Sequence, residues 1–122
     1  MLIILSVKEN GSDFELYFFE RLVKDNPNFV DGLIPLAEVY TRKRMYQEGL
    51  KIDKKLARLR KLDPMIHYNL ACSFALVGEK EEALIVLKHA IKLGYQDLDY
   101  MRKDSDLRSL HNDPRFKSLI SR

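Results

Sequence analysis

Apolar residues recur at intervals of three and four along most of the chain, which is the spacing of an amphipathic helix. Two sets of apolar positions mark successive helices in the most regular stretch: Leu70, Ala71, Phe74 and Val77, then Ala83, Leu84, Leu87, Ala90 and Ile91. Gly78-Glu79 separates the two sets and suits a tight turn. The pattern therefore predicts helical hairpins and an all-α protein.

The hairpin pattern repeats with a period of 34 residues, an offset that relates Leu36-Ala37 to Leu70-Ala71 and Leu50 to Leu84. A fixed period of this length indicates a stack of similar units, each burying its apolar side against the next. We expect a single domain, 1–122, with four parts: a partial first repeat (1–29), a second repeat (30–63), a third repeat (64–96) and a C-terminal cap (97–122).

Several residues predict where the helices begin and end. Ser12 followed by Glu15 forms the pattern of a capping box, which opens a helix that we expect to end near Asp25. Asp63-Pro64 predicts an N-cap followed by a proline in the first helical position. Gly94 suits a left-handed C-terminal cap. These boundaries agree with the division into hairpins.

Pro35 conflicts locally with the helix expected from about Phe29 to Arg42. An interior proline costs a helix roughly 3 kcal/mol unless it lies in the first turn. We therefore expect this helix to begin late, near Asp31, or to bend.

The period and the residues of the third unit resemble the tetratricopeptide repeat. The residues that carry the resemblance are Tyr68-Asn69-Leu70-Ala71, Phe74, Gly78, Ala83 and Ala90. The second unit departs from the pattern, since Arg44 stands at the usual turn glycine, Gly49 at the small alanine and Asp53 at an aromatic position. The resemblance implies a right-handed α-α superhelix of about two and a half hairpins.

The tail is similar to the segment that ends many bacterial arrays of this repeat, from Leu93-Gly94-Tyr95 to Asn112-Asp113-Pro114-Arg115-Phe116. A stack of repeats leaves its last apolar face open to water, and a segment with one apolar side can cover that face. We expect short C-terminal capping helices whose covering residues are Leu107, Leu110, Phe116, Leu119 and Ile120.

Proteins of this family bind a peptide or helix of a partner in the concave groove formed by the first helix of each hairpin. Carried over by position, the resemblance implies a partner-binding groove formed by Asp31, Ile34, Glu38, Thr41, Arg42, Met65, Tyr68, Cys72, Ala75 and Leu76. Members that clamp a C-terminal carboxylate use lysine and asparagine here, whereas this chain has residues such as Ile34 and Glu38. We expect an adaptor or scaffold for an unknown protein partner. Tyr68→Ala or Glu38→Lys should weaken binding of that partner and leave the helicity unchanged.

Charge is unevenly distributed although the net charge is only +3. Residues 42–61 contain a basic stripe: Arg42, Lys43, Arg44, Lys51, Lys54, Lys55, Arg58, Arg60 and Lys61. The stripe offers an alternative function, the binding of nucleic acid or of an acidic partner. Aromatic residues that could stack on bases are sparse beside it, Tyr46 being the nearest, which disfavours nucleic acid.

No motif in the sequence predicts catalysis, a metal or a cofactor. His67, His89 and His111 stand 22 residues apart, too far for a local metal motif, and we interpret each as isolated. Cys72 has no base at a suitable helical spacing. The glycines are scattered singly and form no phosphate loop. We expect that the protein is not an enzyme.

The single cysteine cannot form an internal disulfide, and no apolar run approaches the roughly 20 residues that span a bilayer. The apolar start lacks the basic region and cleavage site of a signal peptide. We expect a soluble cytoplasmic protein without membrane contact.

If Met1 begins the protein, the apolar residues Leu2, Ile3, Leu5 and Val7 belong to a partial helix that no earlier hairpin covers. Uncovered apolar surface marks an interface. We expect this end to pair with a partner or to form a homodimer, with a β-strand as the structural alternative.

Overall fold

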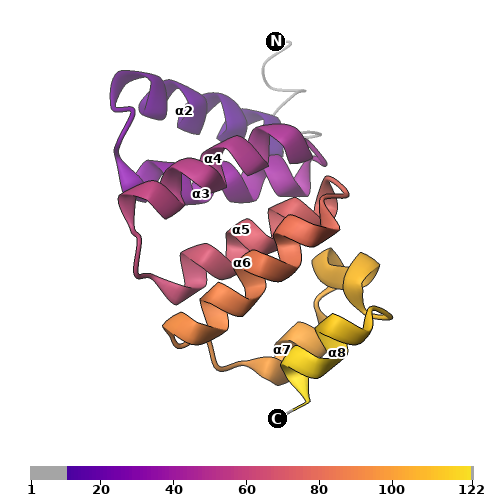
Figure 1. The fold of residues 1–122 in the computed structure, drawn as a ribbon. Coiled ribbons are helices and arrows are strands. Elements are labelled where there is room, and N and C mark those ends of the chain that lie inside the picture. The colour runs from indigo at the N-terminus through magenta and orange to yellow at the C-terminus, as the bar shows by residue number, and fades with distance from the viewer. Residues whose placement is uncertain (1–10, 122) are drawn as a thin grey trace.

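The computed structural model describes residues 11–121, and every regular element in this range is helical. The helices are α2 Gly11–Asp25, α3 Val30–Arg42, α4 Tyr46–Leu59, α5 Pro64–Leu76, α6 Lys80–Leu93, α7 Leu98–Lys103, the 3-10 helix η1 Ser105–Leu110 and α8 Pro114–Ile120 (Figure 1). The expected all-α fold is confirmed. The strand considered for the first residues lies outside the described range.

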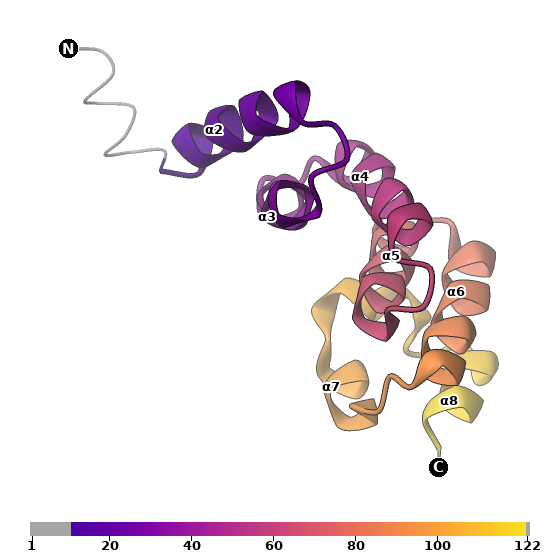
Figure 2. The same cartoon turned by 90° about the vertical axis from the view of Figure 1, so that its left-hand side faces the viewer.

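Successive helices pack side by side, α2 on α3, α3 on α4, α4 on α5 and α5 on α6. The pairs α3–α4 and α5–α6 form two hairpins, each joined by a short turn. In Figure 2 the first helices of the hairpins, α3 and α5, lie toward one side of the stack, and α4 and α6 lie toward the other. This arrangement is the right-handed α-α superhelix that the resemblance to the tetratricopeptide repeat implies.

Two of the expected helix ends are confirmed. The Asp63 carboxylate accepts the N–H groups of Met65 at 2.9 Å and Ile66 at 3.2 Å, which makes it the N-cap of α5. Gly94 follows α6 with φ +119°, a left-handed conformation that glycine adopts without steric strain.

One other expectation about a helix end needs correction, and the expected start of α3 is confirmed to within one residue. Helix α2 ends at Asp25 as expected, but it includes Gly11, so Ser12 lies within the helix and not at the N-cap position. Helix α3 begins at Val30, close to the expected start, and Pro35 lies inside it. Proline has no N–H to donate to the carbonyl four residues earlier. Leu33 and several apolar neighbours on α3 are buried. Each such side chain contributes about 1.5–3 kcal/mol to stability, and together they offset the lost hydrogen bond.

Buried apolar side chains form two clusters of unequal size. The larger cluster joins α5, α6 and the C-terminal cap, while the smaller one joins the inner sides of α3, α4 and the start of α5 through Val30, Leu33, Leu56 and Ile66. The residues expected to cover the end of the stack belong to the larger cluster: Leu107, Leu110, Phe116 and Ile120 are buried, and Leu119 packs against them. The capping helices therefore close the stack as predicted.

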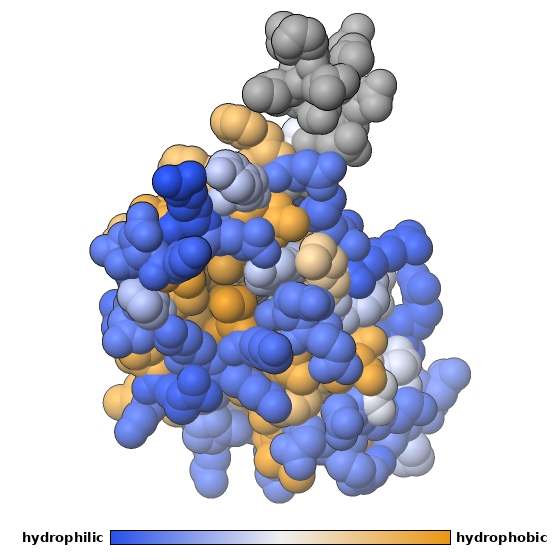
Figure 3. Space-filling model, turned by 90° about the horizontal axis from the view of Figure 1, so that it is seen from above, coloured by the Kyte–Doolittle hydropathy of each residue, from blue (hydrophilic) through white to orange (hydrophobic). Residues whose placement is uncertain are grey.

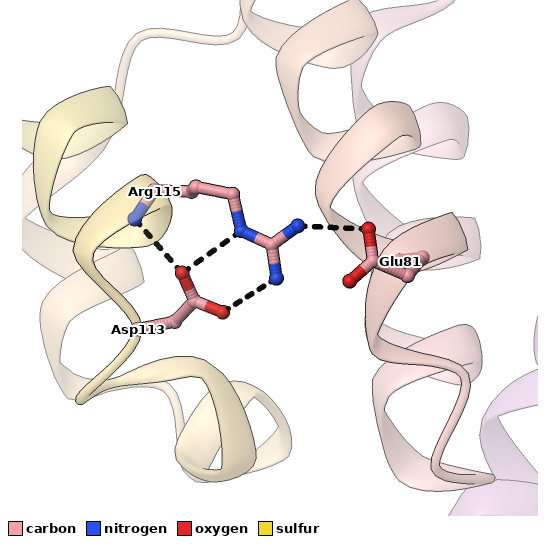
Figure 4. Close-up of polar contacts among 3 residues, drawn as sticks. All are labelled: Glu81, Asp113 and Arg115. Atoms are coloured by element: carbon pink, nitrogen blue, oxygen red, sulfur yellow. Dashed lines mark hydrogen bonds and ion pairs between the residues drawn. The ribbon is translucent and has the colours of Figure 1, made fainter.

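Arg115 joins the last capping helix to α6 (Figure 4). Its guanidinium donates to Asp113 at 3.1 and 2.8 Å and to Glu81 at 2.8 Å. Hydrogen bonds from the Arg115 side chain lower the pKa of Asp113 to about 2. All three side chains are in contact with solvent, so these ion pairs contribute little to stability. Their main effect is to orient α8 against α6.

Candidate functional site

A groove of about 880 Å³ lies along α3 and α5 and is bounded at its far end by the C-terminal segment. Figure 2 shows α3 and α7 at the two ends of this side of the molecule, with α5 between them. Leu56 and Asp53 of α4 contribute to its lining from between α3 and α5. The groove is therefore built on rigid helices, which hold its side chains in fixed positions.

Eight of the ten groove residues named from the sequence line this groove: Ile34, Glu38, Thr41, Arg42, Met65, Tyr68, Cys72 and Leu76. Asp31 is exposed and Ala75 is buried, and neither lines it. Glu38, Arg42 and Met65 are exposed, and Ile34 and Leu76 are half-buried, so these side chains are accessible to a partner.

Tyr68 and Cys72 line the groove but are almost fully buried, because the C-terminal segment covers them. The Tyr68 hydroxyl donates to Asp104 Oδ2 at 2.5 Å, and its ring stacks on Tyr95 with centroids 4.2 Å apart. The Cys72 thiol donates to the same Asp104 oxygen at 3.8 Å. Tyr68→Ala would therefore disturb the cap, which makes it a poor test of partner binding.

Cys72 is also unsuited to nucleophilic chemistry. Burial raises the pKa of its thiol well above the usual value, and the charge of Asp104 raises it further. The thiol therefore stays protonated at neutral pH, whereas the thiolate is the reactive form. This agrees with the expectation that Cys72 is not an activated nucleophile.

Sequence reasoning missed the part of the groove that the C-terminal segment provides. Seven residues of the segment that follows α6 line it: Gly94, Tyr95, Gln96, Asp97, Tyr100, Asp104 and Asp106. Their aromatic and acidic character was visible in the sequence, but the segment was assigned only a covering role. Residues on one helix face can be found by period, whereas the return of the tail to the groove depends on tertiary packing.

Asp53 is a buried carboxylate at the groove, 4% exposed, and it accepts a hydrogen bond from the Ser73 hydroxyl. Burial raises the pKa of Asp53 to about 7, although the Ser73 hydrogen bond acts in the opposite direction. Its side chain therefore changes charge near neutral pH, which an exposed aspartate does not.

The basic stripe is separate from the groove and is partly neutralised. Arg42 donates to Glu15 of α2 at 3.1 Å, and Lys43 pairs with Asp13 of the same helix. Lys54 lies 5.4 Å from the centre of the Phe74 ring. Lys51 and Arg58 of α4 are exposed, and apart from Arg42 the stripe does not line the groove.

Two groups of potential metal ligands come together in the fold. The rings of His67 and His89 lie 4.9 Å apart, so the interpretation of each histidine as isolated is wrong for this pair. The ligand atoms of Cys72, Asp104 and Asp106 lie within 4.8 Å of one another. The Asp104 carboxylate, however, already accepts from Tyr68, Cys72 and the backbone of Asp106, which gives it a structural role.

The end of the stack beside α2 also carries exposed apolar side chains, which contribute to the hydrophobic surface in Figure 3. Phe14, Tyr17 and Phe18 of α2 are each more than half exposed. The residues on which the homodimer expectation rests, Leu2 to Val7, lie outside the described range, and pairing at this end stays a prediction. Among the described helices, none is both long and apolar enough to cross a membrane.

Among the comparisons with known proteins, one solved structure supports a helical-repeat fold. No protein-family model matches the chain. Over 53 residues, 43% of the chain, it is 34% identical to a chloroplastic protein of Arabidopsis thaliana, and the match spans only 16% of that protein. The solved structure titled "MamA MSR-1 C2" superimposes with a TM-score of 0.70 at 19% identity, covering 95% of this chain and 70% of that one. This superposition shows that the chain has a tetratricopeptide-like helical-repeat fold.

Proposed function

We propose that the protein is an interaction adaptor that binds a peptide or helix of a partner protein in the groove along α3 and α5. The observation that carries the proposal is the groove itself, in which the apolar side chains of Ile34, Met65 and Leu76 remain accessible beside polar ones. A surface of this mixed character fits an amphipathic segment.

The open shape of the groove favours a helical or extended segment over a small molecule as its ligand. The groove is open along one side and lies between three elements, α3, α5 and the C-terminal segment. Small-molecule sites enclose most of their ligand, whereas a groove buries one face of a chain segment. Met65, 54% exposed, would lose its contact with water on binding and would be a principal apolar contact.

A photo-crosslinking amino acid placed at position 65, in cells of the native source, tests this proposal. The matched control places it at Ile85, which is 62% exposed but lies on α6, away from the groove. We expect protein adducts from position 65 that Glu38→Lys weakens, and few from position 85. Adducts of equal yield from both positions, or from position 85 alone, would contradict binding in the groove.

A further inference from the structure

The charged residues that line the groove are nearly all acidic. Five carboxylates contribute to the lining, against one guanidinium: Glu38, Asp53, Asp97, Asp104 and Asp106 oppose Arg42. The chain as a whole carries a net charge of +3. The groove therefore has a charge opposite in sign to that of the molecule that contains it.

The one basic residue does not neutralise the groove. Arg42 donates to Glu15 on α2, which does not line the groove. Among the described residues, no ion pair involves Glu38, Asp97 or Asp106. Burial, and then the charge of Asp104, raise the pKa of Asp106, as expected for a carboxylate without a nearby cation.

These acids are placed around accessible apolar surface. Glu38 lies on α3 and is exposed, as is Asp97, which precedes α7 at the other end of the groove. Ile34 and Met65 provide apolar surface on the two helices, and the exposed ring of Tyr100 lies beside Asp97 in the same lining. A ligand that fills the groove would contact apolar side chains along its length and carboxylates at both ends.

Resting on the function proposed above, we propose that the partner segment is a basic amphipathic one, with lysine or arginine directed at Glu38, Asp97 and Asp106 and apolar residues on Ile34 and Met65. Opposite charge across an interface fixes the register of a bound segment and speeds association. The same carboxylates repel nucleic acid and acidic peptides, so the groove and the basic stripe select ligands of opposite charge.

Two synthetic peptides of about four helical turns test the inference. One consists of leucine and lysine in an amphipathic pattern, and the other has glutamate in place of lysine. Fluorescence anisotropy with the full chain measures the affinity of each peptide at low and high salt. Because the net charge of +3 alone would favour the acidic peptide, tighter binding of the basic one reports the groove.

The variants are chosen to change charge without changing the fold. Asp97 accepts the backbone N–H of Tyr100 at 3.0 Å as the N-cap of α7, and asparagine keeps that role. Asp97→Asn combined with Asp106→Asn should weaken the basic peptide about fivefold to tenfold, the effect of two partly exposed charge pairs. The control with the same change in net charge, Asp31→Asn with Asp99→Asn, alters acids outside the groove and should leave affinity unchanged.

Each other result overturns the inference in a way that separates it from the proposed function. If both peptides bind equally and Ile34→Asn abolishes both, the groove binds segments but does not select basic ones. If the acidic peptide binds more tightly and reversal of Lys54, Lys55 and Arg58 abolishes it, the basic stripe is the binding site. If neither peptide binds, the inference fails, and crosslinking at position 65 decides the proposed function independently.

Discussion

The two hairpins of the stack, α3–α4 and α5–α6, have the same architecture but unequal local support for it. The offset of 34 residues relates Phe29 to Asp63. Phe29 precedes α3 without a side-chain cap, whereas Asp63 caps α5 with two hydrogen bonds. Arg44 occupies the turn of the earlier hairpin with φ +61°, and Gly78 occupies the same place in the later one with φ +89°. The two turns therefore have the same left-handed conformation, although only the later one has the glycine that favours it.

The interfaces between hairpins differ as well. Asp53 of α4 and Ser73 of α5 form a buried polar pair at the junction of the two hairpins. One period later the equivalent positions hold Leu87 and Leu107, both fully buried. Along α4, Asp53 also separates Leu50 of the larger apolar cluster from Leu56 of the smaller one.

The comparison shows which forces decide this fold. A left-handed non-glycine residue costs about 1–2 kcal/mol, and a missing N-cap costs about 1 kcal/mol. Burial of one large apolar side chain, such as Leu33, contributes about 1.5–3 kcal/mol, and several are buried on α3 alone. Apolar burial at the repeat positions therefore outweighs the unfavourable local residues of the earlier hairpin.

The largest expected effect is the pH dependence of stability that the buried Asp53–Ser73 pair between the hairpins produces. The pKa of Asp53 is about 7 in the folded chain and 3.8 for an ordinary aspartate, so the folded state binds this proton more tightly. Stability should therefore fall as pH rises from about 4 to 7, by up to about 1.4 kcal/mol per pH unit from this group. Urea unfolding at a series of pH values measures the slope.

Asp53→Asn is the matched variant, because its amide can still accept from Ser73 but does not titrate. Its stability should change less between pH 4 and 7 than that of the parent chain. Equal slopes for the two chains would mean that Asp53 remains solvated. The pKa of Asp113 is lowered to about 2, so its protonation reduces stability only below about pH 4. It therefore does not affect the slope between pH 4 and 7.

A smaller effect should follow from exchanging the turn residues. Arg44→Gly relieves a left-handed conformation and should stabilise the chain by about 1 kcal/mol. Gly78→Ala imposes the same conformation on a side chain and should destabilise it by about as much. Urea unfolding measures both, and changes of the same sign would refute the equivalence of the two turns.

The smallest effect concerns Gly49, which stands in α4 where the later hairpin has Ala83. A Cβ atom at Gly49 would lie 3.6 Å from both Tyr40 Cβ and Thr41 Oγ1, which is ordinary contact. Gly49→Ala should therefore stabilise the chain by about 0.5–1 kcal/mol, because glycine weakens a helix interior.

Gly32 of α3 provides the control for that substitution. A Cβ atom there would lie 3.1 Å from Phe29 Cδ2 and 3.2 Å from Leu22 Cδ2, so the neighbours would have to move. Gly32→Ala should gain less than Gly49→Ala or lose stability in thermal unfolding. A larger gain at Gly32 would show that contact distance does not limit these positions.

Much of the fold could be predicted because its determinants repeat. The period of 34 residues placed Leu36 and Leu70 at equivalent buried positions, and local rules identified Asp63 as an N-cap and Gly94 as a C-cap. The groove could be predicted in part, since α3 and α5 supply Ile34, Glu38 and Met65 to it. These predictions rest on residues close together in sequence or related by a constant offset.

The remaining features depend on contacts between distant residues. The pattern alone did not indicate that Tyr68 is covered by Asp104, 36 residues away, or that His67 and His89 are in contact. It also gave no partner for Asp53, which occupies a position where the repeat has an aromatic residue and accepts a hydrogen bond from Ser73.

Sequence alone determined that this chain is a stack of amphipathic helical hairpins with a terminal cap, because helical period and repeat length are properties of neighbouring residues. Only the tertiary structure decided that the cap returns to the groove and makes its far end acidic, through Asp97, Asp104 and Asp106. The physical reason is that the electrostatic character of a groove is the sum over side chains that packing brings together, and packing is not local in sequence.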